Sequence, residues 1–156
     1  MKRYFAVCIA LYTIVLLYMM FYASGREPSG ISYIQLQPFI TIDHFFNDDN
    51  VDNNAFAVNI VGNIFLFSPF GWLGLCIKKL NKFIPITLFF LFAISTIESA
   101  QYITGRGVAD IDDIVLNTFG MLLGFFVYKF VTFKNIANIC HHFDLEKKTK
   151  SITTIL

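Results

Sequence analysis

The chain has 156 residues and a formal net charge of +1, and 56% of its residues are hydrophobic whereas only 15% are charged. Phenylalanine alone occurs 19 times. This length permits one domain, and so apolar a composition leaves little room for a water-soluble fold. We therefore expect an all-α, polytopic membrane protein with no nucleic acid among its partners.

Four apolar stretches reach the roughly 20 residues that an α-helix needs to cross a hydrocarbon core. They cover residues 4–23, 55–77, 83–104 and 111–131. The first follows Lys2 and Arg3 as a signal peptide would, but it is longer than the ~7–15 apolar residues of a signal sequence, which favours an uncleaved anchor. The sequence thus predicts a four-transmembrane-helix bundle over residues 1–131, followed by a basic tail over residues 132–156.

The distribution of Lys and Arg predicts the orientation of the bundle, because cationic loops stay on the cytoplasmic side. If the N-terminus is inside, ten of the 12 basic residues fall on the cytoplasmic side, and only Arg26 and Arg106 fall outside. Both termini are therefore expected in the cytoplasm, in a multi-pass protein of the plasma membrane. Cys8, Cys76 and Cys140 then lie toward the cytoplasmic side, where disulfides are rare.

The first outer loop, residues 24–54, is long for a connection between membrane helices and is therefore expected to be functional or partly ordered. Its apolar segment 34–40 is too short to cross, so we expect it to lie in the outer interface. The Asn/Asp-rich segment 47–54 lacks the Gly and the terminal Glu of an EF-hand, which favours a solvated turn over a calcium loop.

The cytoplasmic tail has the pattern of a short interfacial helix. Ile136, Ile139, Cys140 and Phe143 are spaced as one helical face, and the lysines around them would favour an anionic inner leaflet. The Cys140-His141-His142 run has no second pair of ligands nearby, so we expect neither a metal nor a cofactor.

The fourth predicted span carries a polar and small-residue stripe. Asp113, Asn117, Gly120 and Gly124 follow one another in steps of four, three and four residues, which places them on one face of an α-helix. Gly120 and Gly124 form a GxxxG pattern that allows another backbone to approach closely. We therefore expect this stripe to face the bundle.

Further polar residues occur at the same depth in the neighbouring spans. Asn59 and Asn63 share a face of the second span, in which Pro69 is expected to introduce a bend. Glu98 lies about 9 Å below the outer end of the third span at 1.5 Å per residue. Polar groups are costly in a membrane and mark functional sites there. The sequence thus predicts an outward-facing polar pocket that binds a ligand through Asn59, Asn63, Glu98, Gln101, Arg106, Asp110, Asp113 and Asn117.

Several of these residues also have structural interpretations. Asp110 stands where an N-cap belongs, and Asp113 three residues later completes a capping-box pattern. The amides can serve as hydrogen bonds between helices. Glu98 is harder to explain structurally, because a buried acid must be protonated or paired, for instance with Arg106 folding back from the turn.

The same residues resemble a known family, the VanZ-like membrane proteins associated with glycopeptide resistance. The resemblance runs from about Ile34 to Gly124. It rests on the motifs Pro38-Phe39, Asn59-xxx-Asn63, Phe67-Ser68-Pro69-Phe70-Gly71, Glu98-Ser99-Ala100-Gln101 and Arg106-Gly107-Val108-Ala109-Asp110-Ile111-Asp112-Asp113. Phe70 is a departure, because the family commonly has a small aliphatic residue at this position. It implies a link to lowered sensitivity to teicoplanin, a lipoglycopeptide that acts at the outer membrane face. It implies no particular biochemical activity.

Three functions agree with these features. The pocket could bind a lipid headgroup, a lipid-linked cell-wall precursor or the lipoglycopeptide itself, with Arg106 contacting an anion. Alternatively, Glu98 is the general acid or base of a membrane-embedded enzyme, although no familiar catalytic motif accompanies it. In the third interpretation the bundle is a partner or assembly factor for another membrane protein, or a homo-oligomer, through its Phe-rich faces and the Gly120/Gly124 groove.

Overall fold

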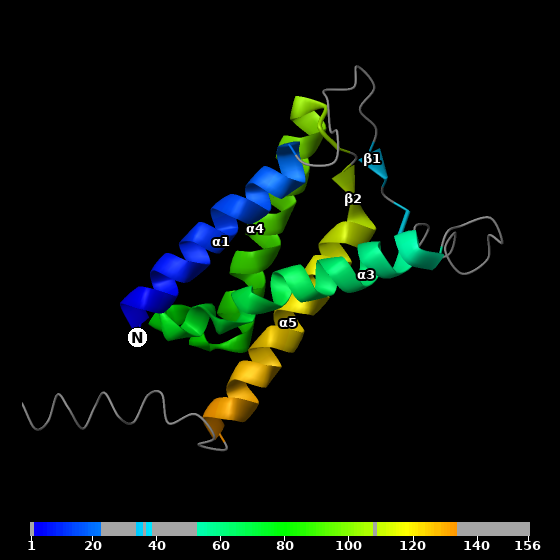
Figure 1. Ribbon diagram of the computed structural model, residues 1–156. Helices are drawn as coiled ribbons and strands as arrows, with labels where there is room; N and C mark the ends of the chain where they lie inside the picture. Colours follow the sequence, from blue (N-terminus) through cyan, green and yellow to red (C-terminus); the bar gives the residue numbers. More distant parts are fainter. Residues whose placement is uncertain (1, 23–33, 36, 39–52, 108, 134–156) are drawn as a thin grey trace, which may run out of the picture. The chain divides into compact units, whose positions relative to one another are not determined.

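Helices make up nearly all of the chain that the structure describes (Figure 1). The computed structural model describes residues 2–22, 34–35, 37–38, 53–107 and 109–133, and of residues 53–59 and 133 it describes the backbone alone. The elements in chain order are α1 (Lys2–Tyr22), β1 (Ile34–Gln35), α3 (Asn53–Phe67), the 3₁₀ helices η1 (Ser68–Leu75) and η2 (Lys78–Asn81), α4 (Phe83–Thr104), β2 (Ala109–Asp110) and α5 (Ile111–Phe133).

The chain divides into two units, and the division falls inside α5. The first unit runs to Phe125 and contains every element up to the middle of that helix. The second begins at Phe126, and its described part is the remainder of α5. Predicted features of the tail, including the interfacial helix and the Cys140-His141-His142 run, lie outside the described residues.

In the part of the chain that the structure describes, three helices are long and apolar enough to cross a membrane, namely α1, α4 and α5. Their bounds agree with the predicted spans at 4–23, 83–104 and 111–131 to within two residues. The outward sides of these helices are strongly apolar; Phe92 of α4, for example, is 75% exposed. Such a surface suits contact with acyl chains, since lipid is as apolar as the side chains themselves.

The second predicted span, residues 55–77, is not one continuous α-helix. The α-helical part ends at Phe67, and the chain continues as the 3₁₀ helix η1, which has Pro69 in its first turn. The cause is local, because a proline has no N–H to donate to the carbonyl four residues earlier. That carbonyl belongs to Phe65, and it accepts a hydrogen bond from the Ser68 hydroxyl at 2.9 Å instead.

The stripe of small residues on α5 packs against α3 and η1, as the GxxxG pattern predicts. A methyl group added at Gly120 would overlap the backbone of Ile64, and one added at Gly124 would overlap Ser68. At the same contact, a methyl group added at Gly71 of η1 would overlap the backbone of α5 at Gly124 and Phe125. The Gly120/Gly124 groove is therefore filled by this chain's own second helical segment and is not a free surface for another protein.

The core lies between α1, α3, α4 and α5 of the first unit. Its aromatic centre is formed by Phe67, whose ring lies 5.8 Å from those of both Phe70 and Phe90. Tyr12 of α1 packs on Phe70 and donates its hydroxyl to the carbonyl of Leu66 at 2.7 Å. The other buried apolar residues of this cluster are Leu16, Leu80, Ile86, Ile94, Met121 and Phe125.

At one end of the unit, two short strands join parts of the chain far apart in sequence. β1 pairs with β2 in parallel, with Ile34 opposite Ala109 and Gln35 opposite Asp110. The first predicted outer loop thus contributes to the turn between α4 and α5. Segment 34–40 is expected from the sequence to lie in the outer interface. The structure describes only residues 34–35 and 37–38 of it, so this expectation stays a prediction.

Candidate functional site

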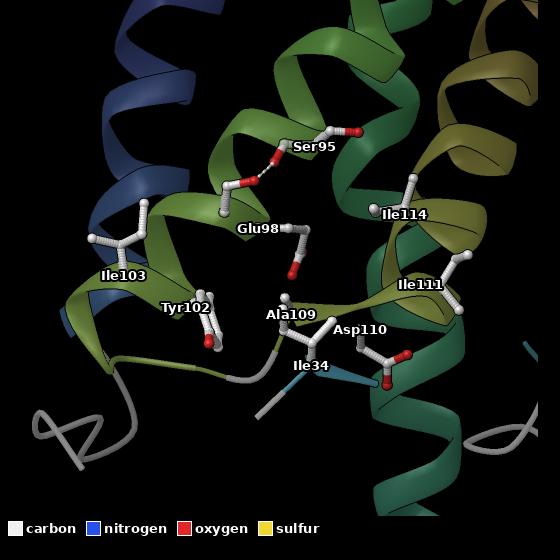
Figure 2. A pocket seen from close by; sticks show the side chains of 10 residues that line it. Ile34, Ser95, Glu98, Tyr102, Ile103, Ala109, Asp110, Ile111 and Ile114 are labelled. Carbon is white, nitrogen blue, oxygen red and sulfur yellow. Dashed lines mark hydrogen bonds between the residues drawn. The ribbon is translucent and has the colours of Figure 1, made fainter. Parts of the chain in front are cut away.

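A pocket of about 440 Å³ lies where α4, β2 and the start of α5 meet β1 (Figure 2). Its lining residues are Ile34, Ser95, Glu98, Ser99, Tyr102, Ile103, Ala109, Asp110, Ile111 and Ile114. Most of these side chains are apolar, and the polar ones gather on α4 and at the end of β2. This combination is typical of sites for small or amphiphilic molecules.

Glu98 is the most deeply buried polar residue of this lining. Its side chain leaves α4 and extends toward Ala109, across the space that Ile111 and Ile114 bound on the other side (Figure 2). Only 3% of the residue is exposed. Burial of an acid in apolar surroundings is costly, so its position at the pocket identifies it as the foremost functional candidate.

Asp110 has a structural task as well as a place in the lining. Its Oδ1 accepts a hydrogen bond from the backbone N–H of Asp112 at 2.9 Å, which caps the N-terminus of α5. The predicted N-cap is confirmed. The carboxylate of Asp113 accepts a hydrogen bond from another helix, described next.

A second polar group lies between α3 and α5, outside the pocket lining. The Asn63 amide donates to Oδ1 of Asp113 at 3.1 Å. One turn further along α5, Asn117 is 1% exposed, and its Oδ1 has no hydrogen-bond partner among the described residues. The side chain of Asn59, which sequence places in the same group, is outside the described part of the structure.

Gln101 and Arg106 are directed toward the end of α1. The Gln101 amide donates to the carbonyl of Met20 at 3.0 Å, and the Arg106 guanidinium donates to that of Phe21 at 3.1 Å. The guanidinium also lies over the ring of Tyr22, 4.4 Å from its centre. These contacts satisfy carbonyls that the last turn of a helix leaves open, and the cation complements the negative end of the helix dipole.

The geometry of the α4 C-terminus explains why Gln101 and Arg106 act together. Gly105 has a positive φ of 65°, its N–H bonds to the carbonyl of Tyr102, and the N–H of Arg106 bonds to that of Gln101. This pair of bonds is the Schellman motif, which reverses the chain at a helix end. The turn at Gly105 carries Arg106 back to the level of Gln101.

Seven of the eight predicted residues have described side chains, and these seven are distributed over three places. Glu98 and Asp110 line the pocket, Asn63, Asp113 and Asn117 belong to the α3–α5 contact, and Gln101 with Arg106 holds the end of α1. Sequence reasoning omitted Asp112, which is 0% exposed, although it stands between Asp110 and Asp113 in the chain. It also omitted Ile34, whose contribution depends on the pairing of β1 with β2.

Metal-binding geometry does not occur in the described residues: no three of their His, Cys, Asp and Glu side chains are grouped so that they could hold an ion. The two cysteines whose side chains are described, Cys8 and Cys76, are both free thiols.

These features define a class, that of helical proteins with membrane-spanning segments and a polar site at one end of the helices. The chain belongs to the VanZ/LLP1 family, whose model matches residues 9–133. No curated protein and no solved structure gives a significant match.

Proposed function

We propose that this protein binds the polar part of an amphiphilic molecule at the outer face of the plasma membrane, in the pocket beside Glu98. The candidate ligands are a lipid headgroup, a lipid-linked cell-wall precursor and a lipoglycopeptide such as teicoplanin. The observation that carries the proposal is a nearly buried carboxyl group in a pocket whose walls are mostly apolar. An amphiphile would match both features, with its polar atoms at Glu98 and its hydrocarbon against the isoleucines.

The proposal includes a four-span topology with both termini in the cytoplasm. Support comes from the distribution of basic residues in the first unit. Lys2 lies beside Cys76, whose thiol is 3.8 Å from its carbonyl, so that the start of α1 and the lysines of η2 lie at the same end. Arg106 is at the opposite end, next to Tyr22. An excess of Lys and Arg at one end is the usual mark of the cytoplasmic side.

Contacts along α5 support a membrane crossing by α3 and η1 together. Asn63 meets Asp113, Ile64 meets Gly120, and both Ser68 and Gly71 meet Gly124, so that the second segment lies against α5 from its first turn to Gly124. The 15 residues of α3 and the eight of η1 together exceed the roughly 20 residues that a membrane span needs.

The function can be tested by expressing the chain in a teicoplanin-susceptible host. Glu98→Gln keeps the size of the side chain and removes its charge. We expect the unmodified chain to lower teicoplanin sensitivity, and loss of this effect in Glu98→Gln at unchanged abundance in the membrane would support a binding pocket. Loss of the protein itself would indicate a structural role for Glu98 and contradict the proposal.

Binding and catalysis are then distinguished with purified protein. Saturable retention of a labelled lipid precursor without product is the result expected from the proposed function. Turnover of the precursor would instead favour the enzyme hypothesis, with Glu98 as general acid or base.

A further inference from the structure

We infer that the 3₁₀ helix η2 and the start of α1 together form a binding surface for the phosphate headgroups of anionic phospholipids. This surface lies at the end of the first unit opposite Arg106, and it does not depend on the ligand proposed for the Glu98 pocket. We call it the basic surface. Its members are Lys2 and Arg3 of α1, Lys78 and Lys79 of η2, and Lys82 between η2 and α4.

Two segments far apart in sequence are held together at the basic surface. The Cys76 thiol lies 3.8 Å from the carbonyl oxygen of Lys2. The start of α1, marked N in Figure 1, accordingly lies beside the 3₁₀ segments, and η2 begins only two residues after Cys76. The basic residues of both segments therefore occupy the same end of the unit.

The backbone of η2 is held in place by the core. Leu80 is buried and belongs to the apolar cluster of the first unit. A methyl group added at Gly74 of η1 would lie 2.9 Å from Cα of Asn81, so the two 3₁₀ helices are in close contact. Lys78 and Lys79, by contrast, are exposed. Their charges thus extend from an ordered backbone, which lowers the entropy that is lost when a headgroup binds.

The basic surface carries no compensating acid within the described part of the chain. All five of its residues are exposed, and none forms an ion pair with a described residue. On α4 the nearest acid is Glu98, 16 residues after Lys82, which is about 24 Å along the helix at 1.5 Å per residue. Residues 134–156 contain four lysines against Asp144 and Glu146, so their side chains add positive charge to the protein.

Two helix N-termini add positive potential at the same end. α1 begins at Lys2 and α4 at Phe83, and neither has an acidic residue in its first turn. α5 differs, because its first turn carries Asp112 and Asp113. Basic residues beside a helix N-terminus are repelled by the positive end of the helix dipole. A bound phosphate would therefore complement both the side chains and the helix ends.

Exposed apolar side chains beside these bases favour a phospholipid over a soluble polyanion. Tyr4, Ile77 and Ile84 are 78%, 45% and 67% exposed. A nucleic acid or an acidic peptide would leave them in water, whereas a phospholipid offers them its acyl chains and offers the lysines its phosphate. In the proposed topology this end faces the cytoplasmic leaflet, which contains anionic lipids.

Trp72, the only tryptophan of the chain, is an intrinsic probe of this surface. It is half-buried in η1, four residues before Cys76. The full chain is placed in vesicles of phosphatidylcholine and phosphatidylglycerol, one of which has brominated acyl chains that quench nearby tryptophan fluorescence. At equal mole fraction we expect brominated phosphatidylglycerol to quench Trp72 more strongly, with a relative association constant about fivefold in its favour.

Substitutions at η2 test whether its lysines cause this preference. The triple variant Lys78→Gln, Lys79→Gln and Lys82→Gln should reduce the relative association constant to less than about twofold. The matched control replaces the same three lysines by Arg, keeps the charges and should retain the preference. Because all three side chains are exposed, the melting temperatures of both variants should stay close to that of the unmodified protein.

Three results would overturn the inference. The first is equal quenching of the unmodified protein by the two lipids, and the second is an unchanged preference in the triple Gln variant. The third is obtained on the unmodified protein alone and decides the matter even where a variant does not fold. Salt at about 1 M shortens the Debye length to about 3 Å and should weaken the preference, so a preference that salt leaves unchanged would not be electrostatic.

Discussion

Asn63 of α3 and Asp113 of α5 are joined by a hydrogen bond of 3.1 Å from the amide to the carboxylate. Ile64, the next residue of α3, is the one whose backbone lies against Gly120 of α5. A polar bond and a close backbone contact thus join two adjacent residues of α3 to α5, at positions two turns apart on α5. The two interactions differ in kind, so that substitutions can separate their contributions.

The Asn63–Asp113 bond is expected to contribute coupling energy between the two helices. Asn63→Ala and Asp113→Ala should each destabilise the fold, and the double variant should lose less than the sum of the two. Coupling energies of membrane hydrogen bonds average about 0.6 kcal/mol and reach about 1.7 kcal/mol. Thermal unfolding of the four proteins in detergent measures the cycle. Strict additivity would show that the bond adds nothing to stability.

Substitution of the interface glycines Gly120 and Gly124 should strongly destabilise the fold. Gly124→Ala places a methyl group on the backbone of Ser68, and Gly120→Ala places one on Ile64. Overpacking of this kind typically costs about 1–3 kcal/mol, and here the neighbouring atoms are backbone and cannot rotate away. The melting temperature of each variant in detergent, compared with that of the unmodified protein, measures this destabilisation.

Gly62→Ala is the matched control for these variants. Gly62 lies in α3, and nothing occupies the space within 4 Å of where its methyl group would go. Alanine there should stabilise the helix by about 0.5–1 kcal/mol, because glycine loses more backbone entropy on folding. Destabilisation by Gly62→Ala to the same degree as by Gly124→Ala would contradict the packing argument.

Much of this fold is predictable from sequence because its signals are local. Spans 4–23, 83–104 and 111–131 follow from apolar length alone, and the buried stripe of Asn117, Gly120 and Gly124 follows from helical spacing. The capping role of Asp110 and the reversal at Gly105 also depend only on neighbours in the chain. Such features require no knowledge of how the helices are placed.

The distribution of the polar residues could not be predicted in the same way. Side chains at a similar depth in the membrane can point in different directions from their helix. Gln101 lies only three residues after Glu98 on α4, yet it bonds to α1 while Glu98 lines the pocket. The pairing of Ile34 with Ala109 joins segments 75 positions apart and leaves no local signal. Pro69 predicts a bend, but the proline alone does not specify that the chain continues in 3₁₀ geometry, with the Ser68 hydroxyl donating to the carbonyl of Phe65 where the proline cannot.

Arg106 is expected to act on stability and not on ligand binding. Arg106→Ala removes the hydrogen bond to Phe21 and the contact with Tyr22, and it should raise hydrogen exchange in the last turn of α1. Arg106→Lys keeps a cation near the helix end and should show a smaller effect. Unchanged exchange together with lost amphiphile binding would place Arg106 in the ligand site instead.

Asp110 can be separated into its capping and ligand-facing contributions. Asp110→Ala should cost about 1 kcal/mol through loss of the N-cap, whereas Asp110→Asn should retain most of that stability because asparagine caps equally well. Hydrogen exchange at the start of α5 measures the cap. If Asp110→Asn loosens this turn as much as Asp110→Ala, the bond to the Asp112 N–H does not hold the helix end.

The proposed orientation can be tested with single cysteines in a background that lacks Cys8, Cys76 and Cys140. Thr104, at the end of α4, and Lys79, in η2, are both exposed. Positive-inside topology places Thr104 outside and Lys79 in the cytoplasm. A membrane-impermeant thiol reagent added to intact cells should therefore label Thr104→Cys and leave Lys79→Cys unlabelled until the cells are opened. The reverse pattern would invert the bundle and place the Glu98 pocket at the cytoplasmic face, where a lipoglycopeptide acting outside the cell could not reach it.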